Sequence, residues 1–255
     1  MARQLVAEGR VSSISVETIR RILRSHRLKP WRKRMWLSPK VPRDQAFTEA
    51  VRQICDLYTR PLEAHERVFC VDEHTSIQPR PRRVPTRASQ PGHPTQVEHE
   101  YSRCGALNLL AALDTRSGQV FGEIAARKRQ VEFIALLEQI EAALPETVSR
   151  VYIVLDNVRM HTGKQIKAWL LAHPRFVFVH PPVHCSWMNQ IEQWFSILVR
   201  KRLKIADFRS KEHLAVRLRA FIQEWNERAH GFHWTVKSFQ KILDKCEQRV
   251  LAKAA

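Results

Sequence analysis

Glycine is scarce in this chain, with seven residues in a length of 255. No GxxxxGKS/T or GxGxxG pattern occurs, so the glycine-rich phosphate loops of the common nucleotide-binding folds are not expected. The five cysteines form no CxxC pair, which argues against a disulfide framework and favours a reducing cytosol. No stretch approaches the ~20 apolar residues of a membrane span, and residues 1–10 lack the apolar segment of a signal peptide. We therefore expect a cytoplasmic protein with no membrane partner.

Acidic residues are also few relative to basic ones. The chain has 25 Asp and Glu and 43 Lys and Arg, which gives a formal net charge of +18. Such an excess favours a polyanionic partner, since neutralising phosphates releases their counterions. Nucleic acid is the first interpretation, and a ribosome-associated or merely basic protein is the alternative. A hydrophobic content of 44% with seven Trp indicates a real core. The length suits one sizeable α/β domain with a smaller appendage.

The basic excess is concentrated at the N-terminus, where residues 1–40 hold eleven Lys and Arg against two Glu. The pattern predicts a helix that Ser15 caps and Pro30 ends. Its expected apolar stripe is Val16, Ile19, Ile22 and Leu23. A basic amphipathic helix of this kind resembles the recognition helix of a helix-turn-helix, although a solvated cationic surface helix is the alternative. The residues expected to contact DNA are Arg20, Arg21, Arg24, Arg27, Lys33 and Arg34.

The rest of the chain alternates between strand and helix patterns. Strands are predicted over 67–72, 106–114, 119–125, 151–156 and 176–180. Helices are predicted over 44–60, 130–144, 164–172, 189–203 and 211–228, and an extended basic loop over 78–96. This order predicts an α/β fold with a mixed five-stranded sheet flanked by helices. The expected divisions are a basic helical segment (1–43), a linker helix (44–65), a catalytic domain (66–228) and a tail (229–255).

Three acidic residues stand at the edges of apolar segments. Asp72 follows VFCV, Asp156 follows VYIVL, and Glu192 lies early in a predicted helix, with 35 residues between the second and third acid. Carboxylates at such edges can converge in a cleft, and hard oxygen ligands suit divalent cations. Any one of them could instead be simple turn or cap chemistry. Three together in a strongly basic chain favour a metal-dependent site that acts on nucleic acid.

The helix that carries Glu192 has two distinct sides. Its predicted buried side consists of Ile191, Trp194, Phe195 and Leu198. The opposite side is predicted to hold Asn189, Glu192 and Ser196. This spacing predicts that Glu192 points out of the core towards the two aspartates.

Three segments carry a resemblance to a known family: VFCVDEHTSIQPR, VLDNVRMHT and HPPVHCSWMNQIEQWFSIL. They resemble the DDE transposases of bacterial insertion sequences, in the superfamily that also holds the mariner elements. The resemblance implies an RNase H-like fold, with two Mg²⁺ or Mn²⁺ ions held by Asp72, Asp156 and Glu192. It also implies cut-and-paste transposition, typically into TA, by a homodimer that binds double-stranded DNA at the element's terminal inverted repeats and in the target.

Several neighbours of the acids are expected to support them. Glu73 and Asn157 flank the aspartates and are candidates to orient ligands or water. His161 is expected either to contact a phosphate or water, or to be a simple exposed polar residue. Asn189 is expected to shape the loop that delivers Glu192. The spacing of His180, His184 and Cys185 fits no standard zinc ligand set.

Two other functions stay open on the sequence. The family usually carries a longer N-terminal region, so a truncated DNA-binding remnant that no longer transposes is one alternative. A nuclease of RNase H-like fold without strand transfer is the other.

Overall fold

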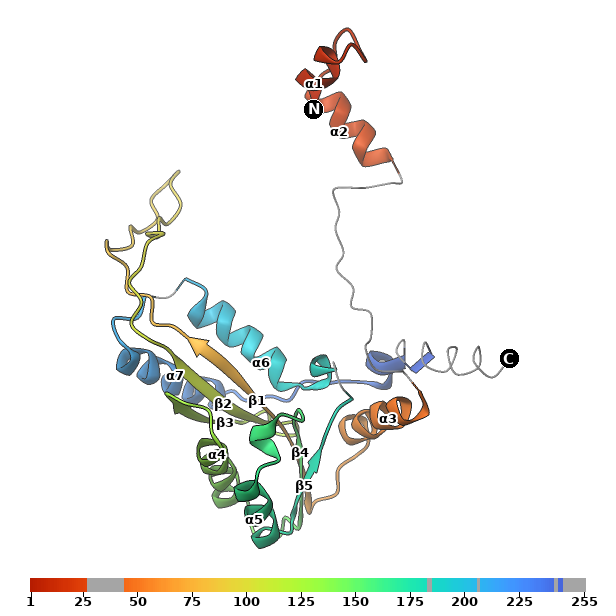
Figure 1. The fold of residues 1–255 in the computed structure, drawn as a ribbon, viewed down its shortest axis with the longest axis vertical. Helices are drawn as coiled ribbons and strands as arrows, with labels where there is room; N and C mark the ends of the chain where they lie inside the picture. The colour runs from red at the N-terminus through yellow and green to blue at the C-terminus, as the bar shows by residue number, and fades with distance from the viewer. Residues whose placement is uncertain (27–43, 183–184, 206, 241–242, 245–255) are drawn as a thin grey trace. The chain divides into compact units, whose positions relative to one another are not determined.

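The computed structural model describes residues 1–26, 44–182, 185–205, 207–240 and 243–244. Residues 1–40 and 41–255 form two separate compact units. The larger unit is built on a five-stranded sheet in the order β3-β2-β1-β4-β5 (Figure 1). The strands are β1 (Glu66–Ile77), β2 (Leu107–Asp114), β3 (Val120–Ala125), β4 (Arg150–Val154) and β5 (Phe176–Val179). β1, β2 and β3 pair antiparallel, whereas β1, β4 and β5 pair parallel. The predicted mixed five-stranded sheet is confirmed.

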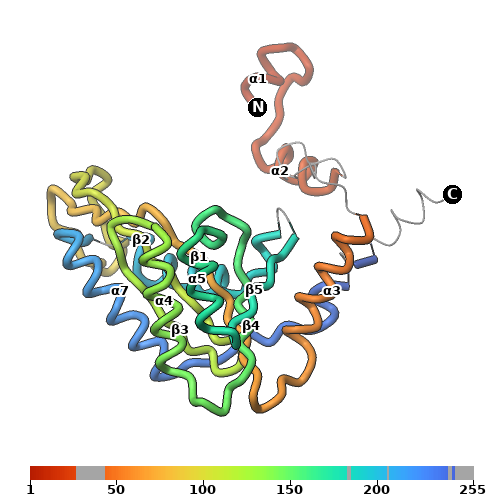
Figure 2. Tube along the Cα trace, turned by 60° about the horizontal axis from the view of Figure 1, so that its bottom comes forward, coloured from red at the N-terminus to blue at the C-terminus, as the bar shows by residue number. Residues whose placement is uncertain are grey.

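Helices cover both faces of this sheet (Figures 1 and 2). The helices of the larger unit are α3 (Gln45–Thr59), α4 (Gln130–Ala143), α5 (Lys164–Ala172), α6 (Ile191–Leu198) and α7 (Lys211–Asn226). Alternate residues of a strand face opposite sides. Accordingly, Val68 and Cys70 of β1 join the core under α3, α6 and α7, whereas Phe69 and Val71 join the core under α4 and α5. Two buried cores therefore hold β1 rigidly at the centre.

The central strand differs from the prediction in one respect that matters for the site. The predicted strand ends at Asp72, but β1 continues to Ile77. Its parallel pairing with β4 stops at Cys70, whereas its pairing with β2 continues through Asp72 opposite Ala111. The prediction was wrong because the ladder with β2 extends a strand whose apolar run has already ended. Asp72 thus lies inside β1, two residues beyond the last residue of this strand that pairs with β4.

The helix that carries Glu192 begins later than predicted. A 3₁₀ turn, η2 (Ser186–Met188), precedes it, and α6 begins at Ile191. After Leu198 the chain continues as a π-helical turn, η3 (Val199–Leu203). The buried side of α6 is as predicted, since Ile191, Trp194, Phe195 and Leu198 are all buried.

An irregular arm follows β1. Two strands of chain run alongside each other through isolated bridges, Arg82 with Tyr101 and Arg87 with Gln96. The guanidinium groups of Arg80 and Arg82 lie 5.3 and 5.6 Å from the Tyr101 ring centroid. Residues 78–105, called the arm below, extend away from the sheet (Figure 1). The predicted extended basic loop is the first part of this arm.

The N-terminal unit contains two helices in its described part, α1 (Ala2–Ala7) and α2 (Val16–Ser25). α1 was not predicted. Ser15 caps α2 as predicted, because its side chain accepts a hydrogen bond from the Thr18 amide. The helix ends earlier than predicted, at Ser25, because His26 adopts an extended conformation.

The predicted apolar stripe of α2 is only partly buried. Ile19 is buried, whereas Val16 and Ile22 are 76% and 53% exposed. Two helices of six and ten residues offer too little surface to cover the whole stripe. Among the helices of the described residues, none combines the length and apolar character that crossing a membrane requires.

Candidate active site

Asp72 is held in place by two groups on different segments. The Glu73 amide donates a hydrogen bond of 2.7 Å to Asp72 Oδ1. The side-chain amide of Asn189 donates to the Val71 carbonyl at 2.8 Å and to Asp72 Oδ2 at 3.4 Å. Asn189 is only 2% exposed, so this amide ties the segment before α6 to the middle of β1. The prediction that Asn189 shares a helix face with Glu192 was wrong, because the residue precedes the helix and points into the protein.

Asp156 follows the end of β4 and lies against a buried histidine. Nδ1 of His161 is 3.1 Å from both the carbonyl oxygen and Oδ1 of Asp156, and the hydrogen bond goes to the carbonyl. Nε2 of His161 bonds Glu73 Oε1 at 2.9 Å. Among described residues, nothing donates a hydrogen bond to the buried Oδ1 of Asp156. His161 therefore links the segment after β4 to β1, across 88 residues of sequence.

The burial of His161 contradicts the expectation of a simple exposed polar residue. Its side chain is fully buried, and its ring centroid lies 4.5 Å from that of Phe133. Burial lowers the pKa of His161, but the hydrogen bonds to Glu73 and to the Asp156 carbonyl, together with the charges of these two acids, raise the pKa above its usual value. Asn157, in contrast, is exposed beside Asp156.

Glu192 lies in the first turn of α6 on the exposed side of that helix. Burial raises the pKa of its carboxyl above the usual value. The pKa of Asp72 is raised to about 7, chiefly by burial and further by the negative charges of Glu192, Glu73 and Asp156, against the Glu73 amide bond, which lowers it. The fold therefore brings the three predicted acids close enough for their charges to interact.

The donor chemistry of this site fits a divalent cation. In the described part of the chain, no three Asp, Glu, His or Cys side chains are already arranged to hold an ion. Nevertheless, the acids repel one another, and Oδ1 of Asp156 and Oδ1 of Asn189 are buried without a hydrogen-bond partner among described residues. Asp156 is 44% exposed and Glu192 is exposed, so both side chains have room to rotate. A cation bound here would offset the repulsion.

One contributor to the site was not predicted. The hydroxyl of Tyr58, on α3, donates to the Met188 carbonyl at 3.0 Å and lies 3.0 Å from Cys70 Sγ. It thereby joins β1, two residues before Asp72, to the turn that precedes Asn189. No local pattern in the sequence reveals a partner 130 residues away.

The predicted DNA-binding residues fall partly within the described chain. Arg20 and Arg21 are exposed on α2, and Arg20 pairs with Glu17 at 2.9 Å. Arg24 is also exposed on α2. Arg27, Lys33 and Arg34 lie outside the described residues, as does His184. His180 bonds the Leu155 carbonyl, and Cys185 is buried.

Comparison with known proteins identifies the class. Residues 67–215 match the DDE superfamily endonuclease family. Because this match covers more than half of the chain, the protein belongs to the DDE superfamily of endonucleases. The predicted resemblance to DDE transposases is confirmed.

Individual relatives agree with this class. The chain is 24% identical over 129 residues to a 39 kDa protein of insertion element IS630 from Shigella sonnei, a match that spans 51% of this chain and 37% of that relative. Its fold is similar to that in a pre-cleavage Mos1 transpososome, with a TM-score of 0.56 and 16% identity, over 98% of this chain and 73% of that one. A Mos1 mariner paired end complex with Mn gives a TM-score of 0.55 and 16% identity, over 98% and 77%. The RNase H-like fold is thereby confirmed.

Proposed function

We propose that this protein is a DNA transposase that cuts at the ends of a mobile element and joins the freed 3′-hydroxyl to target DNA. The proposal includes a cut-and-paste route, TA as the target, and a homodimer that pairs two element ends. The observation that carries it is the convergence of Asp72, Asp156 and Glu192, with the pKa of Asp72 raised to about 7 by burial and by its acidic neighbours. Two similar structures, a Mos1 transposase paired-end complex with left transposon end and a Mos1 strand transfer complex, support DNA as the partner.

In this proposal the three carboxylates hold two Mg²⁺ or Mn²⁺ ions. When bound, such ions lower the pKa of an attacking water or hydroxyl and stabilise the leaving oxygen of an in-line displacement. Asn189 and the Glu73 amide fix Asp72, while His161 fixes the backbone at Asp156. Glu192 is free to move on the exposed side of α6 and completes the ligand set. No covalent protein–DNA intermediate is required, so no Ser or Tyr nucleophile is assigned.

The test is strand transfer in vitro with the inverted repeats found in the DNA that flanks the gene. Wild-type protein should give Mg²⁺-dependent joined products with TA duplicated at the junctions. Asp156→Asn and Glu192→Gln should each lower the rate by about 100-fold or more, since even supporting residues of metal sites are worth 10–100-fold. The matched controls are the exposed carboxylates Asp56→Asn and Glu146→Gln, which should retain the wild-type rate.

A second measurement reports on the metal without relying on activity. Mg²⁺ or Mn²⁺ should raise the melting temperature of the wild-type protein, because a ligand that binds only the folded state stabilises it. The shift should disappear in Asp72→Asn. Wild-type transfer by Asp156→Asn would overturn the assignment of that residue. Hydrolysis without a joined product would indicate a nuclease, and DNA binding without cleavage would indicate a non-transposing remnant.

A further inference from the structure

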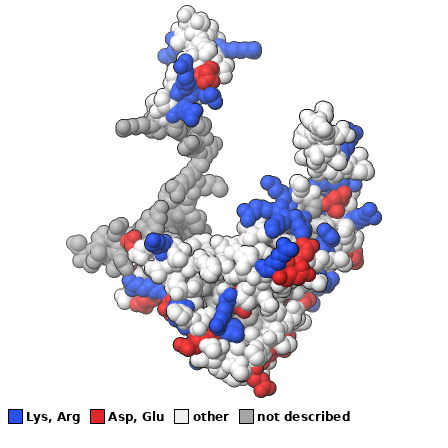
Figure 3. Space-filling model, turned by 180° about the vertical axis from the view of Figure 1, so that it is seen from behind, with Lys and Arg blue, Asp and Glu red and all other residues white. Residues whose placement is uncertain are grey.

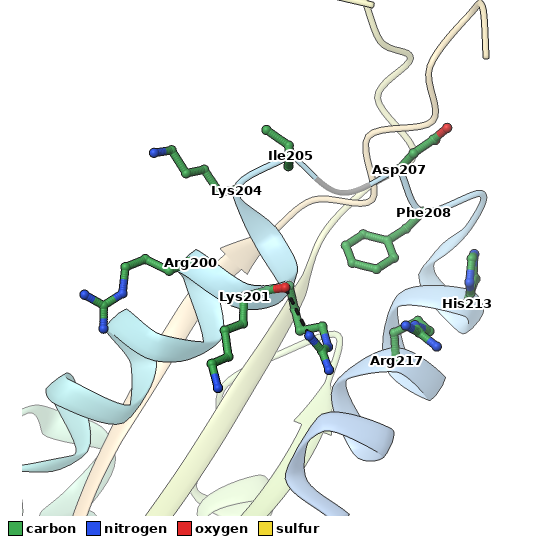
Figure 4. A pocket seen from close by; sticks show the side chains of 9 residues that line it. Arg200, Lys201, Lys204, Ile205, Asp207, Phe208, His213 and Arg217 are labelled. Carbon is green, nitrogen blue, oxygen red and sulfur yellow. Dashed lines mark hydrogen bonds between the residues drawn. The ribbon is translucent and has the colours of Figure 1, made fainter. Parts of the chain in front are cut away.

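A strongly basic pocket lies at the far end of the segment that begins with Glu192. It encloses about 460 Å³ between η3, the residues that follow it and the start of α7. Its cationic lining residues are Arg200, Lys201, Arg202, Lys204 and Arg217. Figure 4 shows Arg200 and Lys204 both pointing outward, away from α7, which carries His213 and Arg217 on the other side of the pocket. Figure 3 shows Lys and Arg side chains gathered at the base of the arm.

We propose that this basic pocket binds the phosphodiester backbone of the duplex whose cleavage site lies at Asp72, Asp156 and Glu192. The identity of that duplex as transposon DNA rests on the proposed function, but the phosphate site does not. It would serve as a second DNA-binding site, distinct from the three acids and from the predicted DNA-binding residues of α2.

Most of the positive charges in the pocket are not paired with acidic side chains of the described residues. Asp207 is the one acidic residue among its described lining residues, and its carboxylate accepts a hydrogen bond of 3.0 Å from the Arg82 amide. Arg202 pairs with Glu224 and lies over the Phe221 ring. The other four cations form no ion pair with the described residues. Several like charges around one concavity favour an anion there.

The local backbone also departs from regular helix at this point. The π-helical turn Val199–Leu203 carries three consecutive cations, and none of its five residues is buried. Such turns occur frequently at functional sites, and the three cations of this one are among the residues that line the pocket.

The pocket lies in line with the active site. Glu192 and Ser196 on α6, Arg200 in the π-helical turn and Lys204 just after it are all exposed and lie along one continuous helical segment. At the α-helical rise of about 1.5 Å per residue, Arg200 and Lys204 lie up to roughly 12 and 18 Å along this segment from Glu192. Phosphates of one DNA strand advance about 3.4 Å per base step. A duplex lying along this segment would therefore place a phosphate roughly three to five steps from the cleavage site at the pocket. An acidic protein segment has no comparable reason to be found beside the three acids.

The first experiment needs no catalysis and no specific sequence. Binding of a fluorescent duplex of arbitrary sequence is measured at several salt concentrations for wild type and Arg200→Gln/Lys204→Gln. The double variant should bind roughly 10-fold more weakly at moderate salt, and its log–log salt slope should be smaller by about 2, because each lost phosphate contact removes about 0.9. The control Arg116→Gln/Arg150→Gln removes two exposed cations at the opposite end of the sheet and should leave the slope unchanged. Both pairs are exposed, and circular dichroism checks that each variant is folded.

The second experiment locates the contact. End duplexes are made with single neutral methylphosphonates at successive positions. Neutral positions three to five steps from the cleavage site should weaken binding by the wild type but not by the double variant.

Equal slopes for the double variant and wild type, or equal sensitivity to every methylphosphonate, would overturn the pocket as a DNA site. Tighter binding of polyglutamate than of duplex, dependent on the same two residues, would also overturn it in favour of a protein partner. Loss of strand transfer with an intact salt effect would instead count only against the transposase function.

Discussion

At the scale of single residues, Asn189 and His161 have a similar role, because each fixes the backbone next to one of the aspartates. Each is buried, and each bonds the backbone beside an acid rather than projecting into the cleft. Asn189 spans 118 residues of sequence to reach Val71, and His161 spans 88 to reach Glu73. Asp72 is therefore fixed by a side chain from a distant segment, whereas His161 ties the nearby Asp156 to Glu73 on β1. These two are positioning residues, since the acids themselves would touch the metal.

Replacing Asn189 tests that positioning role. Asn189→Ala leaves the Val71 carbonyl without its partner and should cost about 1–3 kcal/mol of stability. Because Asp72 is then less fixed, the Mg²⁺ concentration for half-maximal activity should rise about 10–100-fold. Ile140→Val, in the other core, serves as the control because it costs about 0.5–1.5 kcal/mol without touching the site. A metal requirement that stays at the wild-type value in Asn189→Ala would show that the residue is merely structural.

Glu66 gives a prediction on pH and stability. Arg60 bonds both of its carboxylate oxygens, at 2.7 and 2.9 Å, and chiefly for this reason the pKa of Glu66 is lowered to about 2. A lowered pKa means that the stabilisation is fully present above the unfolded value of 4.5 and is lost as the pH falls towards 2. Glu66→Gln should therefore cost about 2–3 kcal/mol at pH 7.

The measurement is urea unfolding of wild type and Glu66→Gln across pH. The difference between the two proteins should be constant above about pH 5 and shrink below it. Glu63→Gln is the control, because this exposed neighbour has no such ion pair among the described residues. A difference that does not change with pH would place the effect in packing rather than in the ion pair.

At the scale of elements, the end of α7 closes the outer edge of the sheet. The side chain of Asn226 accepts a hydrogen bond from the Val120 amide at 2.8 Å and donates one to its carbonyl at 2.9 Å, as a neighbouring strand would. Trp225 donates to the Gly118 carbonyl at 2.8 Å. The chain after α7 then packs on the turn between β2 and β3. This edge is thereby covered rather than left open to pair with another chain.

Gly118 should be essential to that contact. Its φ is +76°, and a Cβ there would lie 2.1 Å from the backbone of His230. Gly118→Ala should therefore cost about 3 kcal/mol or more, from backbone strain together with the clash. Gly105→Ala is a matched control with the same φ, because its Cβ would meet only the flexible side chain of Lys211 at 3.4 Å and should cost about 1 kcal/mol. Equal melting temperatures for the two variants would contradict this account.

Most elements could be predicted from the sequence, because apolar periodicity is a local signal. α5 has the predicted ends, and the buried side of α6 was identified residue by residue. The extension of β1 past Asp72 was missed, because the polar residues that follow form strand only through their pairing with β2. The contacts that Asn189, His161 and Tyr58 make were also missed. Each of these contacts spans 88 to 130 residues, which no spacing in one sequence encodes.

At the scale of the whole molecule, the chain divides into two compact units that carry different chemistry. The acids lie in the larger unit, and half of the excess positive charge lies in residues 1–40. Removing cations that only bind DNA should lower the affinity for DNA, whereas removing the acids should lower the catalytic rate. Kinetic measurements should therefore distinguish the contribution of residues 1–40 from that of the acids.

Neutralising α2 tests this division. In Arg20→Gln/Arg21→Gln, two exposed cations of the predicted DNA-binding set are removed. The concentration of end duplex for half-maximal cleavage should rise roughly 10-fold, by the loss of two phosphate contacts, while the rate at saturating DNA stays unchanged. Asp156→Asn should show the reverse. Arg3→Gln/Arg10→Gln changes the same charge in the same unit away from α2. If that control loses as much affinity, α2 is a solvated cationic helix rather than a DNA-reading one, because only the total charge would then matter.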